Sequence, residues 1–188
     1  MTARIVVLAS GGGTTLQAIL DDAQLRELMV GVGSDRPGTG ALERAEGAGI
    51  DAFVVPFADY DDRGEWNRAF EKALADRAPD LVVLAGFMRI FDAQVVTRFK
   101  MINTHPALLP SFPGVGIRAV RAALAAGVKL SGATVHWVDE GVDSGAIIAQ
   151  VAVPVEPDDD EHTLFARIQA AEKPLYVQAI RELTSEIQ

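Results

Sequence analysis

Short, continuous apolar runs alternate with longer segments of helical periodicity along most of this chain. Strands are expected over 4–9, 28–33, 52–55, 81–85 and 100–104, and helices over 14–27, 40–48, 63–76 and 92–98. Parallel strands are buried on both faces and therefore appear as unbroken apolar runs, with the intervening helices covering those faces. The alternation predicts an α/β fold: a Rossmann-like mixed, mostly parallel sheet with helices on both faces.

The pattern changes in the second half of the chain. Strands are expected over 133–138 and 146–153 with no helix between them, which predicts mixed or antiparallel pairing there. A long terminal helix is expected over 160–184, with Leu164, Ile168, Ala171 and Leu175 on one face. No repeat or linker interrupts the 188 residues, so we expect a single domain over 1–188.

Composition narrows the class of function. The formal net charge of −9 argues against a nucleic-acid partner, because phosphate backbones are bound by clustered Lys and Arg. Cys is absent and only three His occur, so we expect no disulfide, no thiolate nucleophile and no metal site. The longest apolar run, 81–88, is too short for a bilayer, and 5–9 is too short for a signal peptide. We expect a cytoplasmic protein with small-molecule substrates and no membrane partner, and we keep a homodimer open.

The stretch "IVVLASGGGTTLQAIL" predicts a strand, a glycine turn and a helix start. Glycines let a ligand approach the backbone, and Thr14 or Thr15 is expected to cap a helix whose free amides favour an anion. One interpretation is a phosphate cradle; the other is a tight turn that binds nothing. Thr14 replaces the Lys of a P-loop, and Leu16 replaces the third Gly of a dinucleotide fingerprint. Asp35 could still hold a ribose hydroxyl, which leaves a nucleotide-binding module open.

Polar side chains end the fifth expected strand in "INTHPALLPSFPG". Alternation along a strand places Asn103 and His105 on one side, and Pro106 holds His105 extended. An amide donor beside an imidazole suits a developing oxyanion and a proton transfer. The carboxylate to complete a catalytic trio is expected from "VDEGVDSGAI", as Asp139, Glu140 or Asp143. His136, in "ATVHWV", is expected to be a buried, hydrogen-bonded His rather than a catalytic one.

"INTHPALLPSFPG" resembles the N-x-H-P-x-L-L-P signature of the 10-formyltetrahydrofolate-dependent formyltransferases. "GGGTTLQAI", "LAGFMRI" and "GVDSGAIIAQ" follow in the order and spacing of that family, so the resemblance spans essentially the whole chain. It implies the same mixed α/β fold. Within the family, the motifs are most similar to those of the enzymes that formylate glycinamide ribonucleotide in de novo purine (IMP) synthesis. The implied co-substrate is 10-formyltetrahydrofolate.

The resemblance also implies a role for individual residues. The catalytic trio is Asn103, His105 and Asp143, and a cis peptide is implied at Leu109–Pro110. The residues implied to bind the ribonucleotide are Gly12, Gly13, Thr14, Thr15 and Glu172. The residues implied to contact folate are Arg63, Met88, Arg89, Ile90, Phe91, Asn103 and Asp139. In the implied mechanism, Asp143 raises the pKa of His105 and keeps its imidazole charged.

Three departures separate this chain from the family pattern. Thr14 and Thr15 stand where the loop often reads Ser-Asn, and Asp35 stands where Asn is common. The segment 114–121, "GVGIRAVR", lacks a family His and is about two residues longer. The alternatives are another formyl-folate enzyme, such as formyltetrahydrofolate hydrolase, a sugar-amine formyltransferase or a methionyl-tRNA formyltransferase, or a nucleotide-binding module without catalysis.

Overall fold

The computed structural model describes residues 2–114 and 116–187, so Val115 of the departing segment lies outside the described residues. The chain divides into two compact units. One comprises the chain up to Ile102 together with the chain from Ile180 onward, and the other is Asn103–Ala179. The expectation of one domain over 1–188 stays a prediction.

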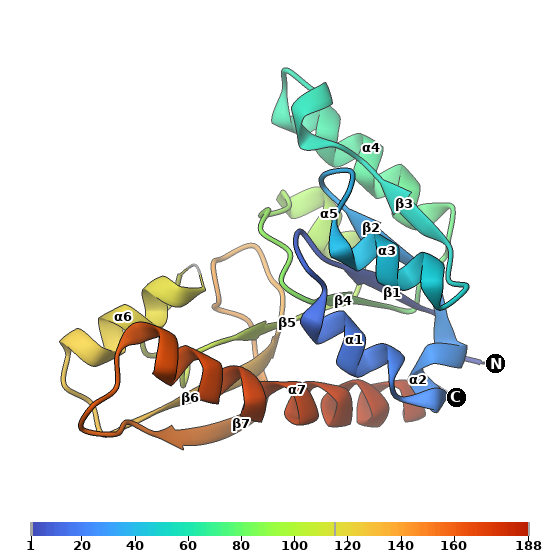
Figure 1. The fold of residues 1–188 in the computed structure, drawn as a ribbon. Coiled ribbons are helices and arrows are strands. Elements are labelled where there is room, and N and C mark those ends of the chain that lie inside the picture. Colours follow the sequence, from blue (N-terminus) through green and yellow to red (C-terminus); the bar gives the residue numbers. More distant parts are fainter. Residues whose placement is uncertain (1, 115, 188) are drawn as a thin grey trace. The chain divides into compact units, whose positions relative to one another are not determined.

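The strands hydrogen-bond in the order β3-β2-β1-β4-β5-β6-β7 in a seven-stranded sheet (Figure 1). Pairing is parallel between β1 and β2, β1 and β4, and β2 and β3, whereas β6 and β7 are antiparallel. The predicted mixed, mostly parallel sheet is therefore confirmed.

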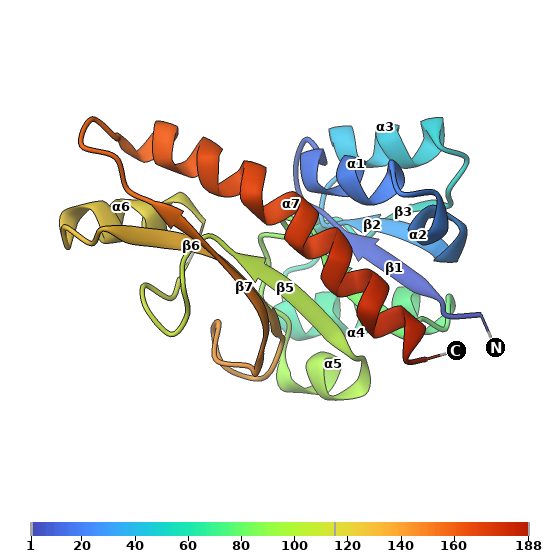
Figure 2. The ribbon, with the colours of Figure 1, turned by 90° about the horizontal axis from the view of Figure 1, so that it is seen from below.

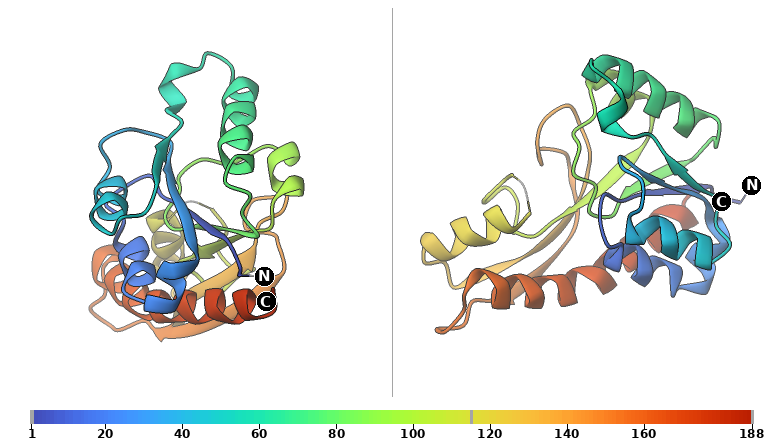
Figure 3. Two further views of the ribbon diagram at one scale, coloured as in Figure 1. Left: turned by 90° about the vertical axis from the view of Figure 1, so that its right-hand side faces the viewer. Right: turned by 45° about the horizontal axis from the view of Figure 1, so that its top comes forward.

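The first unit is built on mostly apolar strands. They are β1 (Ile5–Leu8), β2 (Met29–Ser34), β3 (Ala52–Val54) and β4 (Leu81–Leu84). Every residue of β1 and β4 is buried, as expected of strands covered on both faces. Within this unit, α1 and α3 lie on one face of the strands and α4 and α5 on the other (Figures 2 and 3).

Most helices of the first unit lie in the predicted segments. The helices of this unit are α1 (Thr14–Leu20), α2 (Ala23–Leu28), α3 (Gly40–Gly47), the short 3₁₀ helix η1 (Phe57–Asp59), α4 (Arg63–Ala75) and α5 (Ala93–Arg98). The expected face of Trp66, Phe70 and Leu74 is fully buried. Phe87 and Phe91 pack onto Trp66 and Phe70, forming an aromatic core beneath the chain that follows β4.

The second unit contains a strand hairpin and two helices. Its elements are the end of β5 (Met101–His105), α6 (Ile117–Ala125), β6 (Leu130–Trp137), β7 (Ile147–Pro154) and most of α7 (Glu161–Ser185). The two strands expected without a helix between them do pair, antiparallel. The core of this unit is Val120, Ala133, Val153, Leu164 and Ile168.

Two expectations about helices were wrong. The helix expected over 14–27 is broken, because the Asp22 carboxylate accepts hydrogen bonds from the amides of Gln24 and Leu25 and caps a separate α2. Neither Thr14 nor Thr15 caps α1, because Gly13 is its N-cap and has left-handed backbone angles. In addition, α6 was not predicted, although its buried residues Ala119, Val120 and Ala123 recur at helical spacing. In the described part of the chain, no helix has the length and apolar character needed to cross a membrane.

The Asp22 cap gives a stability prediction. Asp22→Ala removes the acceptor for two amides and an ion pair with Arg181, so we expect it to lower the free energy of unfolding by about 1–2 kcal/mol. Asp22→Asn keeps a capping side chain and loses only the ion pair with a half-exposed Arg, which contributes little. Urea unfolding measures the free energy of unfolding of the two variants. Equal midpoints for Asp22→Ala and wild type would rule out the cap.

Candidate active site

The end of β5 carries the polar side chains that the sequence singled out. Asn103 is half-buried and His105 is 2% exposed. Asn103 and His105 both contact groups from β6 and the loop that follows it, whereas the intervening Thr104 lies beside Glu172 of α7. The strand alternation is therefore as predicted. The Leu109–Pro110 peptide is cis, which confirms the expectation from the resemblance.

Asp143 is the acidic residue of the 138–146 loop that lies beside His105. Its Oδ2 is 3.3 Å from Nδ1 of His105 and accepts a hydrogen bond of 2.8 Å from the amide of Gly114. Asp139 and Glu140, the other candidates for this carboxylate, are exposed. The fold thus brings His105 and Asp143, 38 residues apart in the sequence (143 minus 105), into contact. Asn103 lies near them through His136, which contacts both Asn103 and Asp143.

The loop holds Asp143 in place through its own hydrogen bonds. Oδ1 of Asp139 accepts from the Gly141 amide and the Ser144 hydroxyl, at 3.0 and 2.8 Å. A Cβ on Gly145 would lie 1.8 Å from the Trp137 carbonyl oxygen, so only Gly fits where the loop rejoins the hairpin. Asp143 itself has a left-handed φ of 54°, which Asp tolerates better than most residues. Asp139 therefore shapes the loop, and Asp143 presents its carboxylate.

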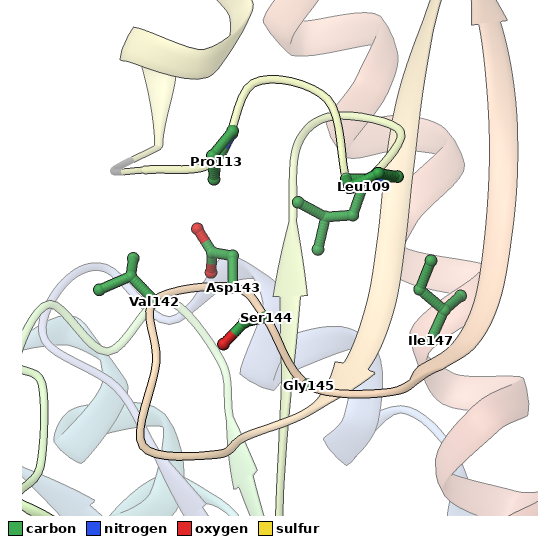
Figure 4. Close-up of a pocket in the computed structure, with 8 residues that line it drawn as sticks. Leu109, Pro113, Val142, Asp143, Ser144, Gly145 and Ile147 are labelled. Carbon is green, nitrogen blue, oxygen red and sulfur yellow. The ribbon is translucent and has the colours of Figure 1, made fainter.

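Figure 4 shows the Asp143 side chain pointing from this loop toward Pro113. A cavity of about 320 Å³ lies beside it, lined mainly by apolar side chains from the turn after β5 and from the loop before β7. The lining residues are Leu109, Pro110, Pro113, Val142, Asp143, Ser144, Gly145 and Ile147. Asp143 is the charged residue among them, and its carboxylate is about one-tenth exposed.

Backbone carbonyls determine where the protons of the imidazoles lie. Nε2 of His105 is 2.8 Å from the Phe112 carbonyl oxygen, which can only accept, so Nε2 carries a proton. The neutral ring then presents the lone pair of Nδ1 to Asp143. Only the imidazolium form of His105 can donate a hydrogen bond from Nδ1 to Asp143. His105 can therefore take up a proton at one atom, Nδ1.

Burial reverses the expected shift at His105. It lowers the pKa of the imidazole, and the nearby His136 adds to that effect, while Asp143 and the Phe112 carbonyl only partly oppose it. Asp143 acts on this pKa in the expected direction, but burial outweighs it, so the expected net rise is contradicted. The pKa of the Asp143 carboxyl also lies below its usual value: burial alone would raise it, but His136, the Gly114 amide and His105 outweigh burial.

His136 is a residue of this site whose role the sequence did not reveal. It is 2% exposed on β6, and its Nε2 is 3.5 Å from Oδ1 of Asp143 and 3.5 Å from Nδ2 of Asn103. The prediction that it is buried and hydrogen-bonded is confirmed. A single sequence gives no signal that it shares Asp143 with His105, because the contact depends on the path of the 138–146 loop.

In the first unit, the glycine turn "SGGGTT" follows β1 and leads into α1. Gly13 has φ of 71°, and a Cβ there would lie 2.7 Å from the Ala41 backbone, so Gly13 is required by packing. A Cβ on Gly12 would meet nothing within 4 Å. Arg44 of α3 donates to the Gly12 carbonyl oxygen at 2.9 Å and steadies the turn. Thr14 is exposed and Thr15 half-buried at the start of α1.

The carboxylate of Asp35 is not accessible to a ribose. Its side chain is fully buried and pairs with Arg89 at 2.8 Å and Arg36 at 3.5 Å. The pKa of Asp35 is lowered: burial alone would raise it, but the Ser10 hydroxyl and the two guanidinium groups outweigh burial. The interpretation of Asp35 as a ribose-binding residue is therefore not supported. The carboxylate instead anchors the chain after β4.

That chain, residues 86–91, is held from several sides within the first unit. The Ser10 hydroxyl accepts from the Met88 amide at 2.9 Å, and Arg63 donates to the Ile90 carbonyl oxygen. Met88 and Ile90 leave large apolar side chains 55% and 52% exposed. The Phe91 ring is buried against Trp66, so Phe91 has only its backbone to offer a ligand.

Glu172 lies on α7 and is 6% exposed. Burial raises its pKa to about 7, against the opposing effects of the Thr104 hydroxyl and the Lys173 ammonium. At neutral pH this carboxyl can therefore either accept or donate a hydrogen bond. Among residues 2–114 and 116–187, no cluster of three or more His, Asp or Glu has an arrangement that could hold a metal ion.

Comparisons with known proteins agree with these features. The family model described as formyl transferase matches residues 3–180. Phosphoribosylglycinamide formyltransferase of Mycobacterium tuberculosis is 49% identical over 97% of this chain and 86% of its own length. The Bacillus subtilis protein of the same name is 36% identical over 96% and 94%.

Solved structures support the same assignment. Glycinamide ribonucleotide transformylase 1 from Symbiobacterium toebii superposes with a TM-score of 0.92 at 44% identity, covering 98% of this chain and 89% of that one. The family model covers nearly the whole chain, and one relative is close to half identical to it. This chain belongs to the formyl transferase family.

Proposed function

We propose that this chain transfers the formyl group of 10-formyltetrahydrofolate to the amine of glycinamide ribonucleotide, a step of de novo purine synthesis. The observation that carries the proposal is the meeting of Asn103, His105 and Asp143 in one unit of a formyl transferase. An amide donor, an imidazole with one open nitrogen and a carboxylate are the groups that formyl transfer to an amine requires. The names of the curated relatives support this substrate.

The ribonucleotide phosphate is assigned to the glycine turn. Gly12, Gly13, Thr14 and Thr15 surround the start of α1, where free backbone amides and hydroxyls suit an oxyanion. The open space at Gly12 allows close approach to the backbone, and Gly13 gives the turn its shape. Glu172 is assigned to the glycinamide end of the substrate, where its carboxylate form would accept N–H groups.

Folate is assigned to the segment after β4 and to the loop after β6. Met88 and Ile90 offer exposed apolar surface for a flat ring, and Phe91 offers backbone groups. Arg63 and Arg89 supply positive charge for the anionic tail, although each is already bonded within its unit. Asn103 contributes its amide, and Asp139 acts by shaping the loop that presents Asp143.

The reaction begins when the amine nitrogen attacks the formyl carbon. A C–N bond forms, the C=O electron pair moves to oxygen, and a tetrahedral intermediate results. The Asn103 amide donates to the oxyanion. Collapse of the intermediate reforms C=O and breaks the bond from carbon to N10 of folate. N10 then requires the proton that the attacking amine has lost.

His105 and Asp143 account for that proton. The Asp143 carboxylate accepts it from the amine, and Nδ1 of His105, 3.3 Å away, holds it as an imidazolium until N10 takes it. The lowered pKa of the free imidazole fits this role, because it favours a neutral ring with an open lone pair. Charge thus appears on His105 only while the oxyanion exists. We propose no metal in this scheme and expect turnover to persist in excess chelator.

The alternatives give different products. A formyltetrahydrofolate hydrolase would release formate without consuming an amine, and a sugar-amine formyltransferase or a methionyl-tRNA formyltransferase would formylate another acceptor. A nucleotide module without catalysis would leave both substrates intact, and the enclosed Asp35 already counts against one version of it. We further expect a cytoplasmic enzyme, and a homodimer stays open.

Substitution of Asp143 tests the proposal. Asp143→Asn keeps the size of the side chain and its tolerance of a left-handed φ but removes the charge. Acid–base groups contribute about 10²–10⁴-fold in rate, so we expect kcat for formyl transfer to fall at least about a hundredfold with both substrates still bound. The assay follows formylated ribonucleotide and tetrahydrofolate together, with chelator present.

Glu140→Gln is the matched control, because it removes a carboxylate from an exposed position of the same loop. It should retain nearly full turnover. Near-normal turnover of Asp143→Asn would remove Asp143 from the mechanism, and a wild-type protein that formylates no ribonucleotide would remove the proposed substrate.

The phosphate assignment predicts that Gly12→Val weakens ribonucleotide binding selectively. A Cβ at Gly12 would meet no protein atom within 4 Å, so we expect the fold to tolerate the substitution while the approach to the backbone is blocked. Gly13→Val would be uninformative, because it clashes with Ala41. Calorimetry should show at least a tenfold rise in Kd for the ribonucleotide and little change for the formyl folate. Gly47→Val, at another open position, is the control; equal weakening of both ligands by Gly12→Val would refute the assignment.

A further inference from the structure

His136 is a buried imidazole that none of the proposed steps uses. Its Nδ1 is 2.9 Å from the Trp137 carbonyl oxygen, and because that oxygen can only accept, Nδ1 carries the proton of the neutral ring. The neutral ring therefore keeps a lone pair on Nε2. The position of Nε2 decides what that lone pair does.

Nε2 of His136 lies equally far, 3.5 Å, from Nδ2 of Asn103 and from Oδ1 of Asp143. A lone pair attracts an N–H of Asn103 and repels the carboxylate. A protonated Nε2 would instead attract the carboxylate and repel the N–H of Asn103. The titratable groups that face His136 are Asp143, from the loop after β6, and His105, from β5.

We propose that His136 is a positioning residue that fixes the amide orientation of Asn103. By accepting from one N–H of Asn103, the neutral ring holds the nitrogen of that amide, rather than its oxygen, on the side of His136. The other N–H then stays available for the oxyanion. An amide can rotate by half a turn at little cost in shape, and the rotated amide would interchange donor and acceptor.

This inference rests on the proposed function for its consequence in catalysis, but its geometry stands without it. His136 acts through Asn103 and does not touch the reacting atoms. Its Nδ1 bond to Trp137, two residues before Asp139, also ties the tautomer to the start of the loop that carries Asp143. One backbone carbonyl thereby sets the donor direction of Asn103.

The test compares two substitutions. His136→Phe fills the site without an acceptor, whereas His136→Gln places an amide oxygen near the position of Nε2 and cannot become an imidazolium. Loss of one oxyanion donor costs about 10²–10³-fold in kcat, and a donor misoriented part of the time loses less. We expect kcat to fall about 10- to 100-fold in His136→Phe, with KM for both substrates within about threefold, and to recover most of the loss in His136→Gln.

His162→Gln serves as the control, since His162 is exposed and lies outside the site. A normal kcat for His136→Phe would overturn the inference. An equal loss in His136→Phe and His136→Gln would also overturn it, because a packing role alone gives that result. Recovery in His136→Gln supports it.

A second measurement needs no turnover and separates this inference from the proposed function. The chain has three His, so ¹⁵N spectra of its imidazoles are simple to assign with the variants above. We expect the neutral form of His136 to carry its proton on Nδ1, and the Asn103 side-chain amide resonance to shift in His136→Phe and return toward wild type in His136→Gln. A proton on Nε2 of neutral His136 would overturn the inference, whether or not the protein forms the proposed product.

Discussion

The Asp143 carboxylate lies between two imidazoles, and the rest of the candidate site depends on that arrangement. One oxygen lies 3.3 Å from His105 and the other 3.5 Å from His136, while the Gly114 amide donates to the first at 2.8 Å. A carboxylate at this depth needs a hydrogen-bond donor, and the Gly114 amide supplies one. Each imidazole is bound to a backbone carbonyl through its other nitrogen, so both rings turn the nitrogen that lacks a fixed proton toward Asp143.

When both rings are neutral, such a cluster can take up one proton. Neutral rings leave lone pairs facing the carboxylate, and burial disfavours charging His105. The cluster would take up the proton that is released when an amine attacks a formyl carbon. It would hold that proton until the leaving nitrogen accepts it. The imidazole of His105 thus gains its positive charge during the reaction rather than carrying it beforehand.

Much of the fold could be predicted from sequence, because apolar runs such as 5–8 and 81–84 are buried on both faces and leave a strong pattern. The choice among Asp139, Glu140 and Asp143 could not be made from spacing alone. It depends on hydrogen bonds within the loop and on the contact of Gly145 with the Trp137 carbonyl. Helix α6 was missed although Ala119, Val120 and Ala123 recur at helical spacing and form its buried face. The sign of the His105 pKa shift was also missed, since burial is not visible in sequence.

The protonation state of His105 tests this account most directly. In the ¹⁵N spectrum of the free protein at pH 7, we predict a neutral His105 with its proton on Nε2, facing the Phe112 carbonyl, because burial lowers the pKa of this imidazole below the ordinary value of about 6.5. Asn103→Ala should leave that state unchanged. An imidazolium at pH 7, or a neutral ring with its proton on Nδ1, would contradict the account.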